Sequence, residues 1–125
     1  MDFNLILKNL LEKAIHCFNI GDYTGLDELI IKNVQFTAPA YKNNIINEPA
    51  VCINDKEELF AYWKRMHGTY PFSITEFEFL EIGKISKFRN TMPDFGYVID
   101  AEIHFNEYGK ATKIFNEVSS EILIK

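Results

Sequence analysis

Apolar residues in the first part of the chain recur at helical spacing. They fall every three or four residues up to about Asn19, which places them on one face of a helix. This apolar set is Phe3, Leu7, Leu10, Leu11, Ala14 and Phe18. Gly21 is expected to end the helix, and Asp22 is a favourable N-cap for a second, shorter helix whose inward face includes Ile30. The pattern therefore predicts two successive helices.

A strand and a loop are predicted next. Residues 34–38 alternate between apolar and polar types, which is typical of a strand with one buried face, and Pro39 is expected to end that strand. Residues 40–53 have no regular period and include Pro49. A loop of this length inside a small domain is more often a binding loop or lid than a simple connection. We therefore expect Tyr41, near its start, to close over a ligand.

A third helix follows the predicted loop. Asn54 and Glu57, three residues apart, are typical of a capping box at a helix N-terminus. The apolar face of this helix consists of Leu59, Tyr62, Trp63 and Met66. Gly68 and Pro71 are expected to end it.

The remaining part of the chain predicts four strands. They cover residues 73–82, 84–92, 95–106 and 110 onward. In the first of them apolar residues occupy both parities, which implies a bulge or burial on both faces. A tight turn at residues 106–109, with Gly109 at its end, joins the last two strands. The resulting order of helix, helix, strand, helix and four strands predicts a single α+β domain over residues 1–125.

Composition limits the classes of function. The chain has 125 residues, 47% of them hydrophobic, with eleven Phe and six Tyr, enough to fill a core and line a cavity. A net charge of -5 without a Lys/Arg cluster argues against nucleic-acid binding. No stretch reaches the ~20 apolar residues of a membrane span, and the first residues lack a signal-peptide pattern, so we expect a cytoplasmic protein that does not bind membranes. Cys17 and Cys52 are expected as reduced thiols, with one disulfide as the alternative.

Four segments, taken in order, resemble one superfamily. They are 18–29, 36–39, 55–63 and 105–114. Together they resemble the SnoaL-like branch of the NTF2-like superfamily over nearly the whole chain. The resemblance implies an NTF2-like α+β cone, in which three helices of the N-terminal half pack on a strongly curved, mostly antiparallel sheet around an apolar pocket. Members include ketosteroid isomerases, polyketide cyclases, epoxide hydrolases, dehydratases and non-catalytic domains, so the fold leaves the function open.

The ketosteroid isomerase reaction can be tested against this sequence. It needs a carboxylate base, together with a tyrosine and a protonated aspartate that stabilise an enolate oxygen. In an ungapped match to that enzyme, the base falls on Ala38, the tyrosine on Ala14 and the second aspartate on Ala101. Asp100 is one residue away, but a one-residue step along a strand turns the side chain to the opposite face. We therefore exclude that isomerase activity.

The same match sets the phases of the last two strands, and together with aromatic residues of the predicted loop and third helix it gives the expected lining of the pocket. The residues expected to enclose a ligand are Phe36, Ala38, Tyr41, Trp63, Ile99, Ala101, Ile103, Asn116 and Val118. The residues Asp100, Glu102 and His104 should face outward. Asn116 is either a structural amide bonded to the backbone or a ligand anchor. Trp63 either roofs the pocket or packs in the core.

Few side chains offer chemistry. The candidate catalytic residues are His67, one turn after Trp63, and Tyr41; the alternative for His67 is a surface position at a helix end. Three scattered histidines and two distant cysteines lack zinc-ligand spacing, so we predict no metal, and no glycine is left over for a phosphate loop, so we predict no cofactor. Arg89 is expected to be solvated or to meet an anionic ligand.

Three functions remain. We favour a module that binds a small apolar molecule in the cone pocket without catalysis. One alternative is a SnoaL-like enzyme of cyclase, isomerase or hydratase type, in which His67 or Tyr41 transfers a proton and Asn116 orients a carbonyl. The other is a module whose pocket is filled by Phe side chains and which serves only in dimerisation. The resemblance also implies a homodimer through the outer sheet face, with Val98 and Phe115 as candidate contacts.

Overall fold

The computed structural model describes residues 2–42, 45–69, 76–92 and 97–118. Its helices are α1 (Phe3–Ile20), α2 (Tyr23–Asp27) and α3 (Lys56–Thr69). Its strands are β1 (Ile30–Lys42), β2 (Ile45–Ile53), β3 (Glu76–Glu81), β4 (Ile85–Met92), β5 (Tyr97–Phe105) and β6 (Ala111–Val118). The order agrees with the predicted one except for β2, which occupies part of the predicted loop.

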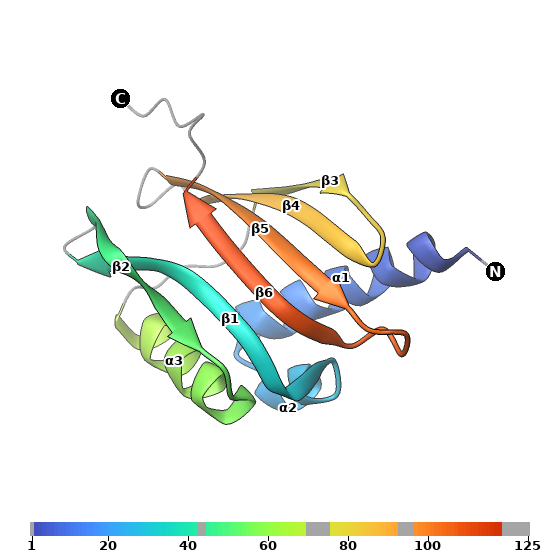
Figure 1. The fold of residues 1–125 in the computed structure, drawn as a ribbon, viewed down its shortest axis with the longest axis horizontal. Coiled ribbons are helices and arrows are strands. Elements are labelled where there is room, and N and C mark those ends of the chain that lie inside the picture. The colour runs from blue at the N-terminus through green and yellow to red at the C-terminus, as the bar shows by residue number, and fades with distance from the viewer. Residues whose placement is uncertain (1, 43–44, 70–75, 93–96, 119–125) are drawn as a thin grey trace.

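The strands form one curved sheet, and the helices lie against one of its faces (Figure 1). The strand order is β2-β1-β6-β5-β4-β3. The pair of β1 and β6 is parallel, and the other neighbouring pairs in this order are antiparallel. The predicted architecture, three helices of the N-terminal half on a mostly antiparallel, curved sheet, is therefore confirmed.

Both ends of α1 are capped. The carboxylate of Asp2 accepts hydrogen bonds from the backbone N–H groups of Asn4 and Leu5. Gly21 has a left-handed φ of 74°, and its N–H donates to the carbonyl of Phe18. The buried residues of this helix lie at helical spacing and are Leu7, Leu11, Ile15, Cys17 and Phe18. Helix α1 therefore begins and ends close to where the sequence predicts, with its apolar face against the sheet.

The second helix is shorter than predicted. Asp22 caps it as expected, because its carboxylate accepts a hydrogen bond from the N–H of Gly25 at 3.0 Å. The helix ends at Asp27, and Ile30 is already the first residue of β1, where it pairs with Ala111 of β6. Ile30 is buried as predicted, but a strand rather than a helix directs it inward, since pairing with β6 gives its backbone a partner.

The predicted loop over residues 40–53 is wrong, because most of it belongs to a β-hairpin. Strand β1 continues past Pro39 to Lys42 and pairs with β2, with a register shift between Ala38 and Ala40. Pro39 lacks an N–H, and a bulge is one of the few places in a sheet that tolerates this. Strand β2 lies at the edge of the sheet, where Pro49 is also tolerated.

Helix α3 has a different N-cap from the predicted one. The carboxylate of Asp55, not the side chain of Asn54, accepts a hydrogen bond from the backbone N–H of Glu58 at 3.1 Å. The carbonyl of Asp55 then accepts the N–H of Leu59 as the first helical bond. The N-cap of α3 is therefore Asp55, one residue after the predicted Asn54.

The antiparallel half of the sheet agrees with the sequence in two details. The predicted irregularity of its first strand is confirmed by a register shift between Phe79 and Glu81. The turn between β5 and β6 is held by Asn106, whose side-chain oxygen accepts the N–H groups of Tyr108 and Lys110. Gly109 has a φ of 76°, which a residue with a side chain rarely adopts. These contacts fix the register of the two strands that carry most of the predicted lining.

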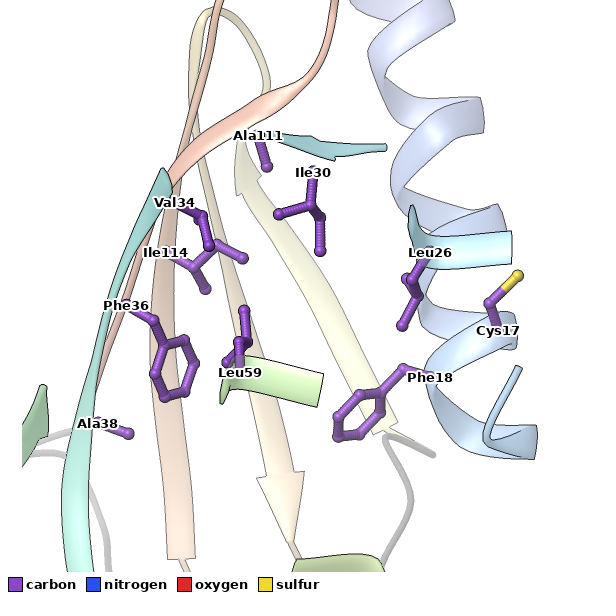
Figure 2. Close-up of a cluster of buried hydrophobic side chains, with 10 residues drawn as sticks. All are labelled: Cys17, Phe18, Leu26, Ile30, Val34, Phe36, Ala38, Leu59, Ala111 and Ile114. Carbon is purple, nitrogen blue, oxygen red and sulfur yellow. The ribbon is translucent and has the colours of Figure 1, made fainter. Parts of the chain in front are cut away.

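The main core lies between the helices and β1 with β6. Figure 2 shows side chains of β1 and β6 directed toward Leu59 of α3 and toward α1 and α2. The buried members of this cluster are Cys17, Phe18, Leu26, Ile30, Val34, Phe36, Ala38, Leu59, Ala111 and Ile114. A second cluster joins α1 to the other half of the sheet and consists of Leu11, Ile15, Phe88 and Ala101. We call the sheet face covered by these clusters the inner face.

Candidate functional site

Strand register decides which side chains reach the inner face. Ala101 of β5 is buried and pairs with Phe88 of β4 and Asn116 of β6. Ile99, two residues earlier, is also buried and pairs with Asn90 of β4. Because residues directly opposite one another in neighbouring strands share a face, these five side chains share the inner face.

Aromatic side chains form one wall of this interior. Trp63 of α3 contacts the ring of Phe18 edge-on, with centroids 5.3 Å apart, and that of Phe36 at 5.9 Å. It also stacks on Phe60 at 6.0 Å, and Phe36 meets Tyr62 at 5.6 Å. Edge-on and offset contacts of this kind are the favourable ones. Trp63 therefore has the core-packing role that was one of its two predicted roles.

Two further predicted lining residues also belong to these clusters. Ala38 is buried at the end of the β1 side of the core, as Figure 2 shows. Ile103 is half-buried and packs against both core clusters. Ala14, like Ala38 and Ala101, packs on the inner side. The three positions that were matched to isomerase catalytic residues therefore face the interior and carry only methyl groups.

Asn90 is a functional candidate that the sequence reasoning missed. Its side chain is 7% exposed, and Oδ1 finds no hydrogen-bond partner among the residues that the structure describes. Polar groups that are buried are nearly always bonded, so an unmatched acceptor needs an explanation. The signal was present in the alternation of β4: Lys87 and Arg89 are charged and Phe88 is apolar, which gives Asn90 the parity of the buried residue.

Two other polar side chains of the inner face, those of Asn116 and Ser86, have hydrogen-bond partners in the backbone. The Nδ2 of Asn116 donates to the backbone carbonyl of Thr37 on β1 at 3.4 Å, a long hydrogen bond. The fully buried hydroxyl of Ser86 donates to the carbonyl of Gly83 at 2.8 Å and accepts its N–H at 3.1 Å. Asn116 thus has the backbone contact of a structural amide, while Ser86 closes the turn before β4.

The opposite face of β4, β5 and β6 carries the charges. Arg89 binds Asp100 through two nitrogens, at 2.7 and 3.2 Å. His104 Nε2 lies 2.7 Å from a carboxylate oxygen of Glu102, and its ring meets that of Phe115 at 5.6 Å. The acidic residues of β5 are therefore outside, as predicted. Arg89 is neither free in solvent nor near the inner face, because Asp100 holds it on the outer face.

Three predicted site residues are placed only by their backbone. Tyr41 pairs with Ile46 within the β1–β2 hairpin, so it lies on a strand and not on the expected lid. His67 belongs to the last turn of α3, and Val118 pairs with Ile99 at the end of β6. The side chains of these three lie outside the described residues, as does that of Val98.

The phenol of Tyr62 is an ionisable group on the aromatic wall. Burial raises the pKa of Tyr62 above its ordinary value of 10.0, while the nearby positive charge of Arg65 acts in the opposite direction. The phenol is therefore neutral near pH 7 and can donate a hydrogen bond. Because the pKa of this phenol lies far above neutrality, Tyr62 is a poor general acid or base near pH 7.

The described part of the chain has neither a metal-binding cluster nor a membrane-spanning helix. Among those residues, His, Cys, Asp and Glu form no group of three able to hold a metal ion. In the same ranges, none of the helices combines the length and the apolar character needed to cross a membrane. Cys17 is buried and Cys52 is exposed, and no disulfide joins them.

Comparison with known proteins identifies the fold. No protein-family model matches the chain, and no curated protein matches its sequence. Solved structures do match. A SnoaL-like protein of unknown function from Burkholderia thailandensis has 16% identity and a TM-score of 0.70, with 91% of this chain and 94% of that one covered.

Two further similar structures have related descriptions. An NTF2-like protein of unknown function from Cytophaga hutchinsonii has 14% identity and a TM-score of 0.66, covering 90% of this chain and 89% of that one. A candidate polyketide cyclase from Sinorhizobium meliloti has 8% identity and a TM-score of 0.71, covering 93% and 100%. The predicted resemblance is therefore confirmed at the level of the fold: this chain has the architecture of SnoaL-like and NTF2-like proteins.

Proposed function

We propose that this protein binds a small, largely apolar molecule between its helices and the inner face of the sheet, without transforming it. One observation supports this most directly: on β4, β5 and β6 the described side chains of the inner face are apolar or carry a neutral amide or hydroxyl, and none of them is acidic. Reactions that move a proton beside a carbonyl need an ionisable group in reach of the substrate. Apolar walls with a few placed polar groups are typical of binding sites for small molecules.

A thermal-shift screen tests the proposal. The panel contains steroids, polyketide-like aromatic compounds and fatty acids. A compound that binds only the folded protein at 100 times its Kd stabilises it by about 2.7 kcal/mol, so the melting temperature rises by several degrees. Ala101→Val adds two methyl groups on the inner face of β5, which reduces the space for a ligand, and should therefore reduce the rise in melting temperature. Glu102→Gln, the next residue on the same strand but on the outer face, should leave it unchanged.

The outcomes separate the alternatives. If a bound compound is converted to product and His67→Ala abolishes the conversion, the protein is an enzyme and the proposal is wrong. If no compound of any class raises the melting temperature, the interior is filled by its own side chains, and a role in dimerisation alone is favoured. Binding without product, unaffected by His67→Ala, supports the proposal.

A further inference from the structure

We propose that Asn90 is the polar anchor of this interior, and that the molecule bound there is neutral and presents a hydroxyl group to the amide oxygen of Asn90. This inference rests on the proposed function, because it names the chemical class of the same ligand. It also predicts a property of the protein without ligand, so the two proposals can fail separately.

The position of Asn90 is fixed by strand register. Asn90 of β4 lies directly opposite Ile99 of β5, and Phe88, two residues earlier, lies opposite Ala101. All four side chains are buried. Asn90 therefore points toward the same interior as the predicted lining residues. Asn116, opposite Ala101 on the far side of β5, stands two strand spacings across and two residues along from Asn90, about 12 Å away.

Among the described polar side chains of the inner face, Asn90 is the one with a fully buried atom that lacks a hydrogen-bond partner. The hydroxyl of Ser86 donates one hydrogen bond to the backbone of Gly83 and accepts another from it. The amide of Asn116 is oriented by the carbonyl of Thr37. The Oδ1 of Asn90 is buried and has no partner among the described residues. An amide oxygen only accepts hydrogen bonds, so the missing partner is a donor.

The distribution of charged side chains around Asn90 indicates whether the ligand group that donates to its Oδ1 is charged or neutral. Asp100, the neighbour of Ile99 on β5, faces outward and is held by Arg89. On β4, β5 and β6 the carboxylates pair with outer-face residues, so these strands offer nothing to balance a buried ammonium group, and a cationic ligand beside them would carry an uncompensated charge. Lys87, Arg89 and Lys113 lie on the same outer face, so these three strands give an anionic ligand no cation either. A neutral alcohol or phenol supplies a donor without either cost.

Three naphthalene probes test this chemistry by calorimetric titration. The first, 2-naphthol, has the hydroxyl donor; 2-methoxynaphthalene has the same ring and oxygen without a donor; 2-naphthoate carries a negative charge. The wild-type protein should bind 2-naphthol about tenfold more tightly than the ether, the effect of one hydrogen bond to a buried acceptor. It should bind 2-naphthoate most weakly of the three.

Two variants assign the preference to a residue. Asn90→Leu, which is similar in size, should remove the preference for 2-naphthol while leaving the affinity for the ether nearly unchanged. Asn116→Leu, the matched change on the other side of β5, should keep the preference, because its amide is already bonded to Thr37. Equal binding of naphthol and ether by the wild-type protein, or a preference that survives Asn90→Leu, would overturn the inference and leave the proposed function standing.

The stability of the ligand-free protein gives an independent readout. If Oδ1 of Asn90 is unmatched, replacing the amide by an apolar side chain of similar size removes a buried polar group without breaking a bond, so Asn90→Leu should raise the melting temperature. A lower melting temperature would show that Asn90 has a partner in the protein and would overturn the anchor role. Absence of binding by all three probes, with the melting temperature raised, would count against the proposed function instead.

Discussion

The contact between α1 and α2 at Gly25 leads to a prediction with an unexpected sign. A Cβ added at Gly25 would lie 2.7 Å from Sγ of Cys17 and 2.9 Å from Oδ2 of Asp22, well inside the ordinary carbon contact distance of about 3.5–4.0 Å. Propensity alone predicts that Gly25→Ala stabilises a helix by about 1 kcal/mol. The tertiary contact predicts the opposite.

The magnitude follows from three contributions. Overpacking against the buried Cys17 costs about 2 kcal/mol, within the usual range for an extra methyl in a packed site. Displacing the Asp22 carboxylate, which caps α2 by accepting the N–H of Gly25, costs about 1 kcal/mol. The propensity gain of about 1 kcal/mol offsets part of this. We therefore expect Gly25→Ala to lower the free energy of unfolding by about 2 kcal/mol.

Urea denaturation measures the loss, with the fluorescence of the single tryptophan, Trp63, as the signal. The double variant Cys17→Ala/Gly25→Ala should be more stable than the sum of the two single effects by at least about 1 kcal/mol, because the new methyl enters the space left by the sulfur. Gly83→Ala is the control: a Cβ there meets nothing within 4 Å, so its effect should be small. Wild-type stability of Gly25→Ala, or additive effects in the double variant, would refute the reasoning.

Two further predictions follow from other contacts, and a third from the resemblance to NTF2-like proteins. Lys56 Nζ lies 2.9 Å from the carboxylate of Asp27 and donates to the carbonyls of Asp27 and Ile30. Lys56→Met should therefore lower the free energy of unfolding, measured in urea, by about 1–3 kcal/mol. Lys64→Met, at an exposed position of α3, should have little effect, and equal losses in the two variants would contradict this prediction. Burial raises the pKa of Tyr62, so the folded state keeps a proton that the unfolded state loses above pH 10.0. The free energy of unfolding should therefore fall above that pH, and less steeply in Tyr62→Phe. If urea titrations at pH 9 to 11 give the same dependence on pH for both proteins, the prediction is wrong. We also expect a homodimer, and sedimentation as a monomer at micromolar concentration would exclude it.

Local sequence was sufficient where an element depends on its own residues. The caps of α1 and α2, the turn at Asn106 and the irregularity in β3 are produced by side chains close to them in the chain. The inner and outer sets of β5 and β6 could also be predicted, because alternation along a strand leaves only two choices and the charged residues exclude one of them.

Local sequence was insufficient where the partner is distant in the chain. Residues 40–53 have no period of their own, and β2 exists because β1 offers its backbone groups as partners. For the same reason Tyr41 is on a strand and Pro39 at a bulge. Arg89 was open to several interpretations until the register of β4 and β5 placed Asp100 beside it.

The sequence by itself thus determined the extent of α1, the cap of α2, the strand parity of β5 and β6 and the resemblance to the NTF2-like fold, since each is encoded in short-range spacing. Only the tertiary structure decided which of the two inner-face amides has a hydrogen-bond partner. Asn116 and Asn90 both have inner-face parity, and nothing in their sequence neighbourhoods distinguishes them. The difference arises because the carbonyl of Thr37 on β1 lies within reach of Asn116, whereas the oxygen of Asn90 is enclosed without a donor among the described residues.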